Sequence, residues 1–202
     1  MSNQLIVFIK NPVLGTVKTR LASTEGEEQA LLIYQDLLDK CLNETLKVDA
    51  HRYLYYSNSI DEKDNWPSMH YEKRLQKKGA DLGGKMSAAF EQLIQDEQIK
   101  TVIIGSDCYD LTAGIIQQAF DILEHNDLVF GPANDGGYYL MGMKNYYPEL
   151  FKKITWSSNL VLEQSLEIAK KKDLSFSLLE ELIDLDTIDD VKKSSYPYPR
   201  KN

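Results

Sequence analysis

Short apolar runs alternate along the chain with longer segments in which apolar residues recur every three or four positions. The short runs predict buried strands, because brief apolar and β-branched stretches between turn residues are typical of a sheet interior. The longer segments predict amphipathic helices. The expected strands cover residues 5–9, 51–57, 101–105, 127–131 and 138–143, with a further short one at 174–178. The expected helices cover residues 26–46, 86–94, 115–123, 159–171 and 188–193.

This alternation of strands and helices predicts an α/β fold with a largely parallel sheet covered on both faces. The chain has 202 residues and no internal repeat, low-complexity tract or linker, so one domain over residues 1–195 is expected. Residues 196–202 have no period and are expected to form a tail that lies on the surface or frays.

Composition narrows the class of protein. The formal net charge of -8 disfavours nucleic-acid binding, which depends on clustered cations. Two distant cysteines indicate neither a disulfide framework nor a zinc site, and they fit a reducing cytoplasm. No run of about 18 apolar residues and no leader pattern occurs, so no membrane insertion is expected. The oligomeric state is not indicated.

A cationic segment follows the first expected strand. Residues 10–21, KNPVLGTVKTRL, contain Lys10, Lys18 and Arg20, with Gly15 allowing close backbone approach. Because open α/β sheets bind ligands beyond the carboxyl ends of their strands, these cations are candidates for gripping a phosphate-bearing substrate. The alternative is that Lys18 and Arg20 are surface charges of a loop or helix start.

Carboxylates follow later strands. Asp107 and Asp110 come directly after the strand at 101–105, and hard oxygen ligands suit Mg²⁺ or Mn²⁺. Asp110 has a competing interpretation as the cap of the helix that begins near Thr112. Asp135 lies in the turn NDGG and is either a plain β-turn residue or a second metal or substrate contact opposite Asp107.

Residues 79–86, GADLGGKM, resemble a phosphate loop but lack its hydroxyl residue, and no buried strand is expected before them. A P-loop is therefore rejected. The segment is expected to be a loop in which Asp81, Gly83 and Lys85 approach a nucleotide, or else a loop that only caps a helix.

Other chemistry has little support. Ser158 is a plausible N-cap of the late helix, and Trp156 either packs structurally or lines an acceptor pocket. The three histidines and two cysteines form no catalytic triad or dyad, and no dinucleotide-binding GxGxxG occurs.

Six motifs in order carry a family resemblance: KNPVLGTVKTRL, GADLGGKM, IIGSDCYDL, FGPANDGGYYLMGM, ITWSS and LIDLDTIDDV. Together they resemble a bacterial family assigned as GT-A-type glycosyltransferases and related to molybdenum-cofactor and phospholactate guanylyltransferases. The resemblance implies a three-layer αβα fold of the nucleotide-diphospho-sugar transferase type, a nucleotide donor and a divalent metal.

The resemblance also implies roles for matching residues. Lys10, Lys18 and Arg20 match the donor loop, Asp107 the metal-binding aspartate, and Asp135 the aspartate of the DGG motif. Asp186 matches the closing D-x-D-T element and is expected to organise that turn. The sequence departs from the pattern with Tyr109 in place of proline and Lys85 in place of arginine.

Three functions follow as expectations. The first is metal-assisted glycosyl transfer from a nucleotide-sugar to a small acceptor, with Lys18, Arg20 and Asp135 as catalytic groups and Asp107 and Asp135 holding Mg²⁺ or Mn²⁺. The second is nucleotidyl transfer from a nucleoside triphosphate with release of pyrophosphate. The third is a nucleotide-binding module without turnover.

Overall fold

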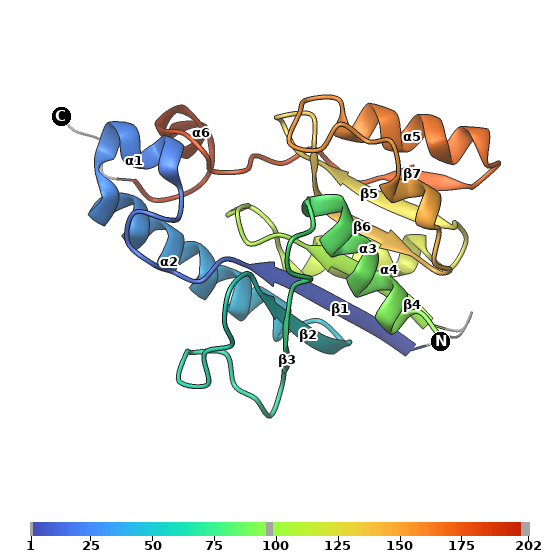
Figure 1. The fold of residues 1–202 in the computed structure, drawn as a ribbon, viewed down its shortest axis with the longest axis horizontal. Helices are drawn as coiled ribbons and strands as arrows, with labels where there is room; N and C mark the ends of the chain where they lie inside the picture. Colours follow the sequence, from blue (N-terminus) through green and yellow to red (C-terminus); the bar gives the residue numbers. More distant parts are fainter. Residues whose placement is uncertain (1, 96–98, 199–202) are drawn as a thin grey trace.

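The computed structural model describes residues 2–95 and 99–198, and these form one sheet between two layers of helices (Figure 1). The described residues contain seven paired strands in the order β3-β2-β1-β4-β6-β5-β7. Among them only β6 runs antiparallel to its neighbours. The strands are β1 Ser2–Ile9, β2 His51–Tyr56, β3 Glu72–Leu75, β4 Ile99–Ile104, β5 Leu128–Pro132, β6 Tyr138–Met143 and β7 Phe176–Leu178. The α/β class, the mostly parallel sheet and the three layers are as the sequence predicts.

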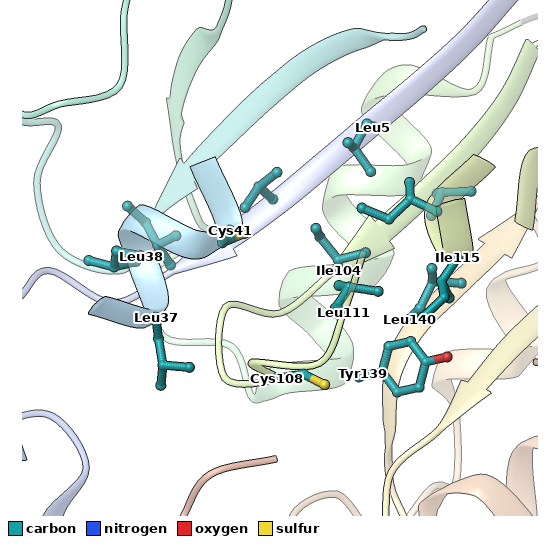
Figure 2. Packing of buried hydrophobic residues seen from close by; sticks show 14 of the residues in the cluster. Leu5, Leu37, Leu38, Cys41, Ile104, Cys108, Leu111, Ile115, Tyr139 and Leu140 are labelled. Atoms are coloured by element: carbon teal, nitrogen blue, oxygen red, sulfur yellow. The ribbon is translucent and has the colours of Figure 1, made fainter. Parts of the chain in front are cut away.

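The helices divide between the two faces of the sheet. The α-helices are α1 Thr19–Glu25, α2 Glu27–Thr45, α3 Leu82–Leu93, α4 Ala113–Ile122, α5 Val161–Lys171 and α6 Ile188–Lys193, with a 3₁₀ helix η1 at Pro148–Phe151. One apolar core joins α2 and α4 to the sheet, and a second joins α3, η1 and α5 to the opposite face. Figure 2 shows part of the first core, in which side chains from β1, α2, β4, α4 and β6 meet.

Strand direction places the connecting loops that matter here. Because β1, β2, β3 and β4 are parallel, their carboxyl ends lie at one edge of the sheet. β6 runs the other way, so its first residue, Tyr138, lies at that same edge. The segments after β1, β3 and β4 and the turn before β6 therefore converge.

Three elements are absent from the sequence-based expectation: α1, β3 and the 3₁₀ helix η1. The cationic segment was described as a loop, with a helix start at Lys18 and Arg20 only as part of the alternative interpretation, and α1 begins at Thr19. Residues 74–78 were expected to hold no buried strand. The edge strand β3 ends there at Leu75, and its polar residues stay half-buried or exposed. Edge strands need only one paired side and one covered face, which explains the weak apolar signal.

Asp81 is the N-cap of α3, as the helix-capping alternative for residues 79–86 expects, but Gly83 and Gly84 lie inside the helix and not in a loop. Two other cap assignments from the sequence are wrong. The N-cap of α4 is Thr112 and not Asp110, whose carboxylate instead accepts hydrogen bonds from the backbone N–H and hydroxyl of Ser195. The N-cap of α5 is Leu160, because Ser158 closes a short turn by accepting from Leu160 N–H at 3.2 Å.

After β7 the chain crosses back over the sheet edge to α6, which lies beside α1 (Figure 1). The Tyr196 hydroxyl donates to Asp36 of α2, and Tyr198 donates to Glu25 of α1. The described part of the C-terminal segment thus lies on the N-terminal helices. No helix among the described residues is long and apolar enough to span a membrane.

Candidate active site

A cavity of about 670 Å³ opens at the carboxyl edge of the sheet. This volume lies within the range of small-molecule sites. Its charged lining comes from segments far apart in the chain: Lys10, Lys18, Arg20, Lys85, Asp107, Asp135, Asp184 and Asp186. Cations and carboxylates therefore share one opening.

The segment after β1 is anchored before it reaches the cavity. Asn11 accepts from Asn58 N–H at 3.0 Å and donates to Ser59 O at 2.8 Å, which ties the segment to the loop after β2. Lys10 N–H donates to the Tyr34 hydroxyl at 2.8 Å, and that hydroxyl lies 3.2 Å from Ser106 Oγ. The beginning of the cationic segment is thereby held against the sheet.

Lys18 occupies the centre of the charged lining. Its side chain is 3% exposed, and its Nζ lies 2.7 Å from Asp107 Oδ1 and 3.3 Å from Asp186 Oδ1. Burial lowers the pKa of the ammonium, but Asp107, Asp186 and Asp184 outweigh it, so the Lys18 pKa is raised above its ordinary value. Lys18 is therefore charged when the cavity is empty of ligand.

The backbone of Lys18 is unusual. Its φ of 48° and ψ of 43° lie in the left-handed region, which costs a non-glycine residue on the order of 1–2 kcal/mol. Lys18 is also the N-cap of α1 without any side-chain cap bond. The strained turn aims its side chain at the carboxylates rather than at the helix end.

The closing D-x-D element supplies two of these carboxylates. Its backbone is fixed by hydrogen bonds from Leu185 N–H to Asp107 O at 2.9 Å and from Asp186 N–H to Asp184 O at 2.9 Å. Asp186 was expected only to organise this turn, yet its carboxylate also reaches Arg20 Nη1 at 3.6 Å.

Asp184 is the most perturbed carboxyl of the site. Burial raises its pKa, Asp107, Asp135 and Asp186 raise it further against the opposing effect of Lys18, and the result is about 7. The like charges therefore stand close enough to repel one another.

The opposite wall is apolar and aromatic. Trp156 lies against α3 where a Cβ on Gly83 would come within 2.0 Å of its ring, so only glycine fits there. Phe151 stacks on the same indole at 6.5 Å between ring centroids. Trp156 thus packs structurally and lines the cavity together with Tyr138.

Some residues predicted from the sequence lie outside the cavity lining. Gly15 forms a turn with φ of 75° beside the Glu27 carboxylate. The Asp81 carboxylate accepts from Gly84 N–H at 2.7 Å as the α3 cap. Gly83 stands behind Trp156. Lys85, in contrast, lies on the cavity side of α3.

Asp135 lies at the cavity mouth. Its Oδ1 accepts from Gly137 N–H at 2.8 Å, so it closes the turn before β6, and it is exposed. The turn interpretation and a ligand contact are compatible, because the second carboxylate oxygen stays available.

Sequence reasoning missed Asp184 and Gln76, which also line the cavity. Asp184 belongs to a motif that had been recognised, and its alternation with Asp186 could have indicated two carboxylates on one side of an extended segment. Gln76 carries no such signal, since it follows a weak edge strand.

The carboxylates of the cavity fit a divalent metal only if a substrate also supplies ligands. Among residues 2–95 and 99–198 no group of three or more His, Cys, Asp or Glu side chains is arranged to hold a metal ion. Asp107 and Asp135 are nevertheless both close enough to Asp184 to raise its pKa, so carboxylates gather in one part of the cavity. Mg²⁺ is often held by one or two carboxylates together with substrate phosphates, and that arrangement fits these residues.

The family model described as "Uncharacterized protein conserved in bacteria (DUF2064)" matches residues 37–158. No curated protein matches the chain.

Solved structures match over nearly the whole chain. A provisionally assigned nucleotide-diphospho-sugar transferase from Desulfovibrio desulfuricans G20 is 30% identical, with a TM-score of 0.86, covering 95% of this chain and 85% of that one. The 4-diphosphocytidyl-2C-methyl-D-erythritol synthase of Anaerococcus prevotii DSM 20548 is 10% identical, with a TM-score of 0.60 and coverages of 95% and 93%. Rv0371c of Mycobacterium tuberculosis H37Rv, in complex with manganese, is 9% identical, with a TM-score of 0.57 and coverages of 98% and 100%. The last two similarities show the fold alone.

Proposed function

The chain belongs to the bacterial family DUF2064, and from that premise we propose that it is a metal-dependent transferase that uses a nucleotide donor. The reaction we propose first is glycosyl transfer from a nucleotide-diphospho-sugar to a small acceptor. The relative from Desulfovibrio desulfuricans G20 supports this choice, since it is provisionally assigned to that class and is 30% identical.

The observation that carries the proposal is the buried Lys18 between Asp107 and Asp186 at the carboxyl edge of the sheet. A strained backbone and a buried ammonium are costly to maintain, and such costs concentrate at functional sites. A donor diphosphate entering the cavity offers Lys18 and Arg20 a stronger anionic partner. Both cations would then stabilise the charge that grows on the leaving diphosphate.

Asp107 and Asp135 are the residues that would hold Mg²⁺ or Mn²⁺. When bound, the cation neutralises negative charge on the diphosphate. The manganese complex of Rv0371c supports a divalent cation in this fold. In the proposed reaction the bond between the sugar's anomeric carbon and the diphosphate breaks, and the acceptor oxygen bonds that carbon and gives up its proton.

A second candidate is nucleotidyl transfer from a nucleoside triphosphate. Four cations, Lys10, Lys18, Arg20 and Lys85, line the cavity, and together they suit the greater charge of a triphosphate. In that reaction an acceptor phosphate attacks the α-phosphorus, and pyrophosphate leaves.

One experiment separates the candidates. The purified protein is incubated with Mg²⁺ or Mn²⁺, with panels of nucleotide-sugars and nucleoside triphosphates, and with sugars and sugar phosphates as acceptors. Released nucleoside diphosphate supports glycosyl transfer, and released pyrophosphate supports nucleotidyl transfer. Binding without either product supports a nucleotide-binding module instead.

Matched variants test the site itself. Asp107→Asn is expected to abolish the metal-dependent product, whereas Asp110→Asn is expected to keep it, because Asp110 bonds Ser195 outside the cavity. If no nucleotide raises the melting temperature of the wild-type protein, the proposed donor site is wrong.

A further inference from the structure

Gln76 stands at the far side of the cavity from the carboxylates. It follows β3, is 8% exposed and lines the opening. Its backbone N–H continues the ladder by donating to Tyr56 O at 3.0 Å. Its side chain crosses the end of β2 toward β1.

The orientation of the Gln76 amide follows from its partners. The side-chain nitrogen donates to Ile9 O at 3.1 Å and to Tyr55 O at 3.2 Å. Both partners are carbonyl oxygens, which only accept, so the NH₂ group must face them. Both of its N–H bonds are thereby used, and only the oxygen Oε1 can interact further.

That oxygen is the free polar atom of the side chain. No described residue donates a hydrogen bond to Gln76 Oε1. Among the described residues, the side-chain polar atoms that are both sealed from solvent and unpartnered are Asn3 Oδ1 and the Tyr138 hydroxyl. Gln76 Oε1 therefore keeps open surface, and Gln76 is among the residues that line the cavity.

A purely structural role explains the NH₂ group of Gln76 but not its side-chain oxygen. Joining the ends of β1 and β2 explains the two donated hydrogen bonds. It does not explain a fixed acceptor left open in a cavity whose lining also includes the buried apolar side chains of Phe8 and Met86. A ligand that brings an N–H or O–H donor with a flat apolar face would complete both features.

We propose that Gln76 is a specificity-determining residue whose Oε1 accepts a hydrogen bond from a ring or exocyclic N–H of the donor's nucleobase. The inference rests on the proposed use of a nucleotide donor. Phe8 and Met86 supply the apolar surface against which the base lies.

The spacing across the sheet agrees with this assignment. The Gln76 amide lies over the ends of β1 and β2, while Asp107 and Lys18 gather beyond β4, the other neighbour of β1. Adjacent strands are about 4.8 Å apart, so the two places are separated by on the order of 10 Å. A nucleoside bridges a span of this order between its base edge and its phosphates. Lys10, at the end of β1, lies between them.

The test compares Gln76→Met with a matched control, Gln92→Met. Methionine has a similar length and removes the acceptor, and Gln92 lies on α3 outside the cavity lining, where it accepts from the Tyr55 hydroxyl. Dissociation constants are measured for UDP, CDP, GDP, ADP, dTDP and inorganic pyrophosphate, each with Mg²⁺. Loss of one hydrogen bond is worth roughly a fivefold to tenfold change in affinity.

We expect wild type and Gln92→Met to prefer one base over the others. Gln76→Met should bind that nucleotide roughly fivefold to tenfold more weakly while binding pyrophosphate unchanged. Equal base preference in both variants overturns the inference. If wild type binds pyrophosphate but no nucleoside diphosphate better, the proposed donor site fails first, and the two failures are thus distinguishable.

A ligand-side measurement covers the case in which Gln76→Met does not fold. The preferred nucleotide is compared, on the wild-type protein, with its analogue whose Watson–Crick-edge N–H is methylated. The inference requires weaker binding of the methylated analogue by a similar factor. Equal binding of the two overturns it.

Discussion

At the scale of single residues, the site depends on a lysine held where lysine is disfavoured. Lys18 adopts φ of 48°, and its ammonium is almost fully buried among aspartates. The backbone strain and the desolvation both oppose folding. They are offset by contacts with Asp107 and Asp186, so the residue is fixed before any ligand arrives.

Replacing Lys18 with glycine should separate the role of its backbone from that of its charge. Glycine adopts the left-handed region without strain, so α1 should still begin at Thr19. We expect Lys18→Gly to lower kcat on the order of 10²–10³-fold in whichever transfer reaction is observed, since one buried cation at the leaving group is lost. Steady-state kinetics on the preferred donor measure this.

The chain offers a control for that variant. Lys153 also has a positive φ, of 60°, but is exposed and lies outside the cavity lining. Lys153→Gly should leave kcat unchanged and stabilise the protein slightly. Equal losses of activity in both variants would mean that the effect is not specific to the Lys18 charge.

Tyr109, where the resembling family has proline, lies away from the cavity. Its ring meets that of Tyr196 edge-on at 5.1 Å between centroids, and Lys40 Nζ stands 5.7 Å from its centre. The substitution therefore joins the loop after β4 to the C-terminal segment. The structure gives it a packing role and no contact with the charged lining.

At the scale of elements, α3 and the loop that carries Trp156 form one wall of the cavity. A Cβ on Gly83 would overlap the indole, whereas Gly114 in α4 has open space around the same position, with its nearest neighbour at 3.7 Å. The two helical glycines therefore have opposite tolerances for alanine.

We expect Gly83→Ala to lower the free energy of unfolding by about 1–3 kcal/mol, because the added methyl displaces Trp156. Gly114→Ala should be neutral or should raise it by up to about 1 kcal/mol through helix propensity. Urea unfolding of both variants measures this. In the Trp156→Ala background Gly83→Ala should cost little; an undiminished cost there would show that the indole is not the obstacle.

A second element-level feature is the contact between α2 and the start of α4. The Glu44 carboxylate accepts from Ala113 N–H at 3.0 Å and pairs with Lys40 and Lys47, each at 2.9 Å. Burial raises the pKa of Glu44, but these partners outweigh it, and the folded-state pKa is lowered to about 2.

This pairing predicts a pH dependence. Because the folded pKa lies below the unfolded value of about 4.5, the ionised Glu44 contributes stability fully above about pH 4.5 and loses it as the pH falls toward 2. Glu44→Gln should therefore be less stable than wild type by about 1 kcal/mol near pH 6, with a smaller difference near pH 3.

Urea midpoints over that pH range test the Glu44 prediction. Glu167→Gln, which removes an exposed pair with Lys171, should change the midpoint little at any pH. A Glu44→Gln difference that is constant with pH would contradict the assignment.

The elements that could be predicted from the sequence are those with a strong local pattern. Strands β4 and β6 and helix α6 are apolar, β-branched or well-capped segments, and their places were predictable. Helix α1 was not, because its N-cap is a strained lysine without a cap bond. The roles of Asp184 and Asp186 toward Lys18 depend on a contact across 168 positions in the chain, which no local pattern encodes.

At the scale of the whole molecule, the site joins both ends of the sequence. β1 with its cationic segment, the loop after β4 and the closing D-x-D element meet at one edge of the sheet. Figure 1 shows the chain after β7 returning toward α1 to complete this arrangement. The balance of charge in the cavity is therefore a property of the assembled fold.

That balance predicts how metal and nucleotide bind together. The described residues hold no three-ligand group, and Lys18 already pairs with Asp107, so Mn²⁺ alone should bind weakly. A bound nucleoside diphosphate would add phosphate oxygens to the ligands that Asp107 and Asp135 offer the cation. The same phosphates would attract Lys18. Each ligand should then raise the affinity for the other by the same factor.

We expect the rise in melting temperature with Mn²⁺ and a nucleoside diphosphate together to exceed the sum of the two separate rises. Calorimetric titration of the nucleotide with and without Mn²⁺ should give a coupling of roughly 5–150-fold, and EDTA should remove it. Asp107→Asn should lose the coupling yet keep metal-free nucleotide binding through Lys18, Arg20 and the base recess. Tight Mn²⁺ binding without nucleotide would contradict this arrangement, because it would require a protein-only coordination site.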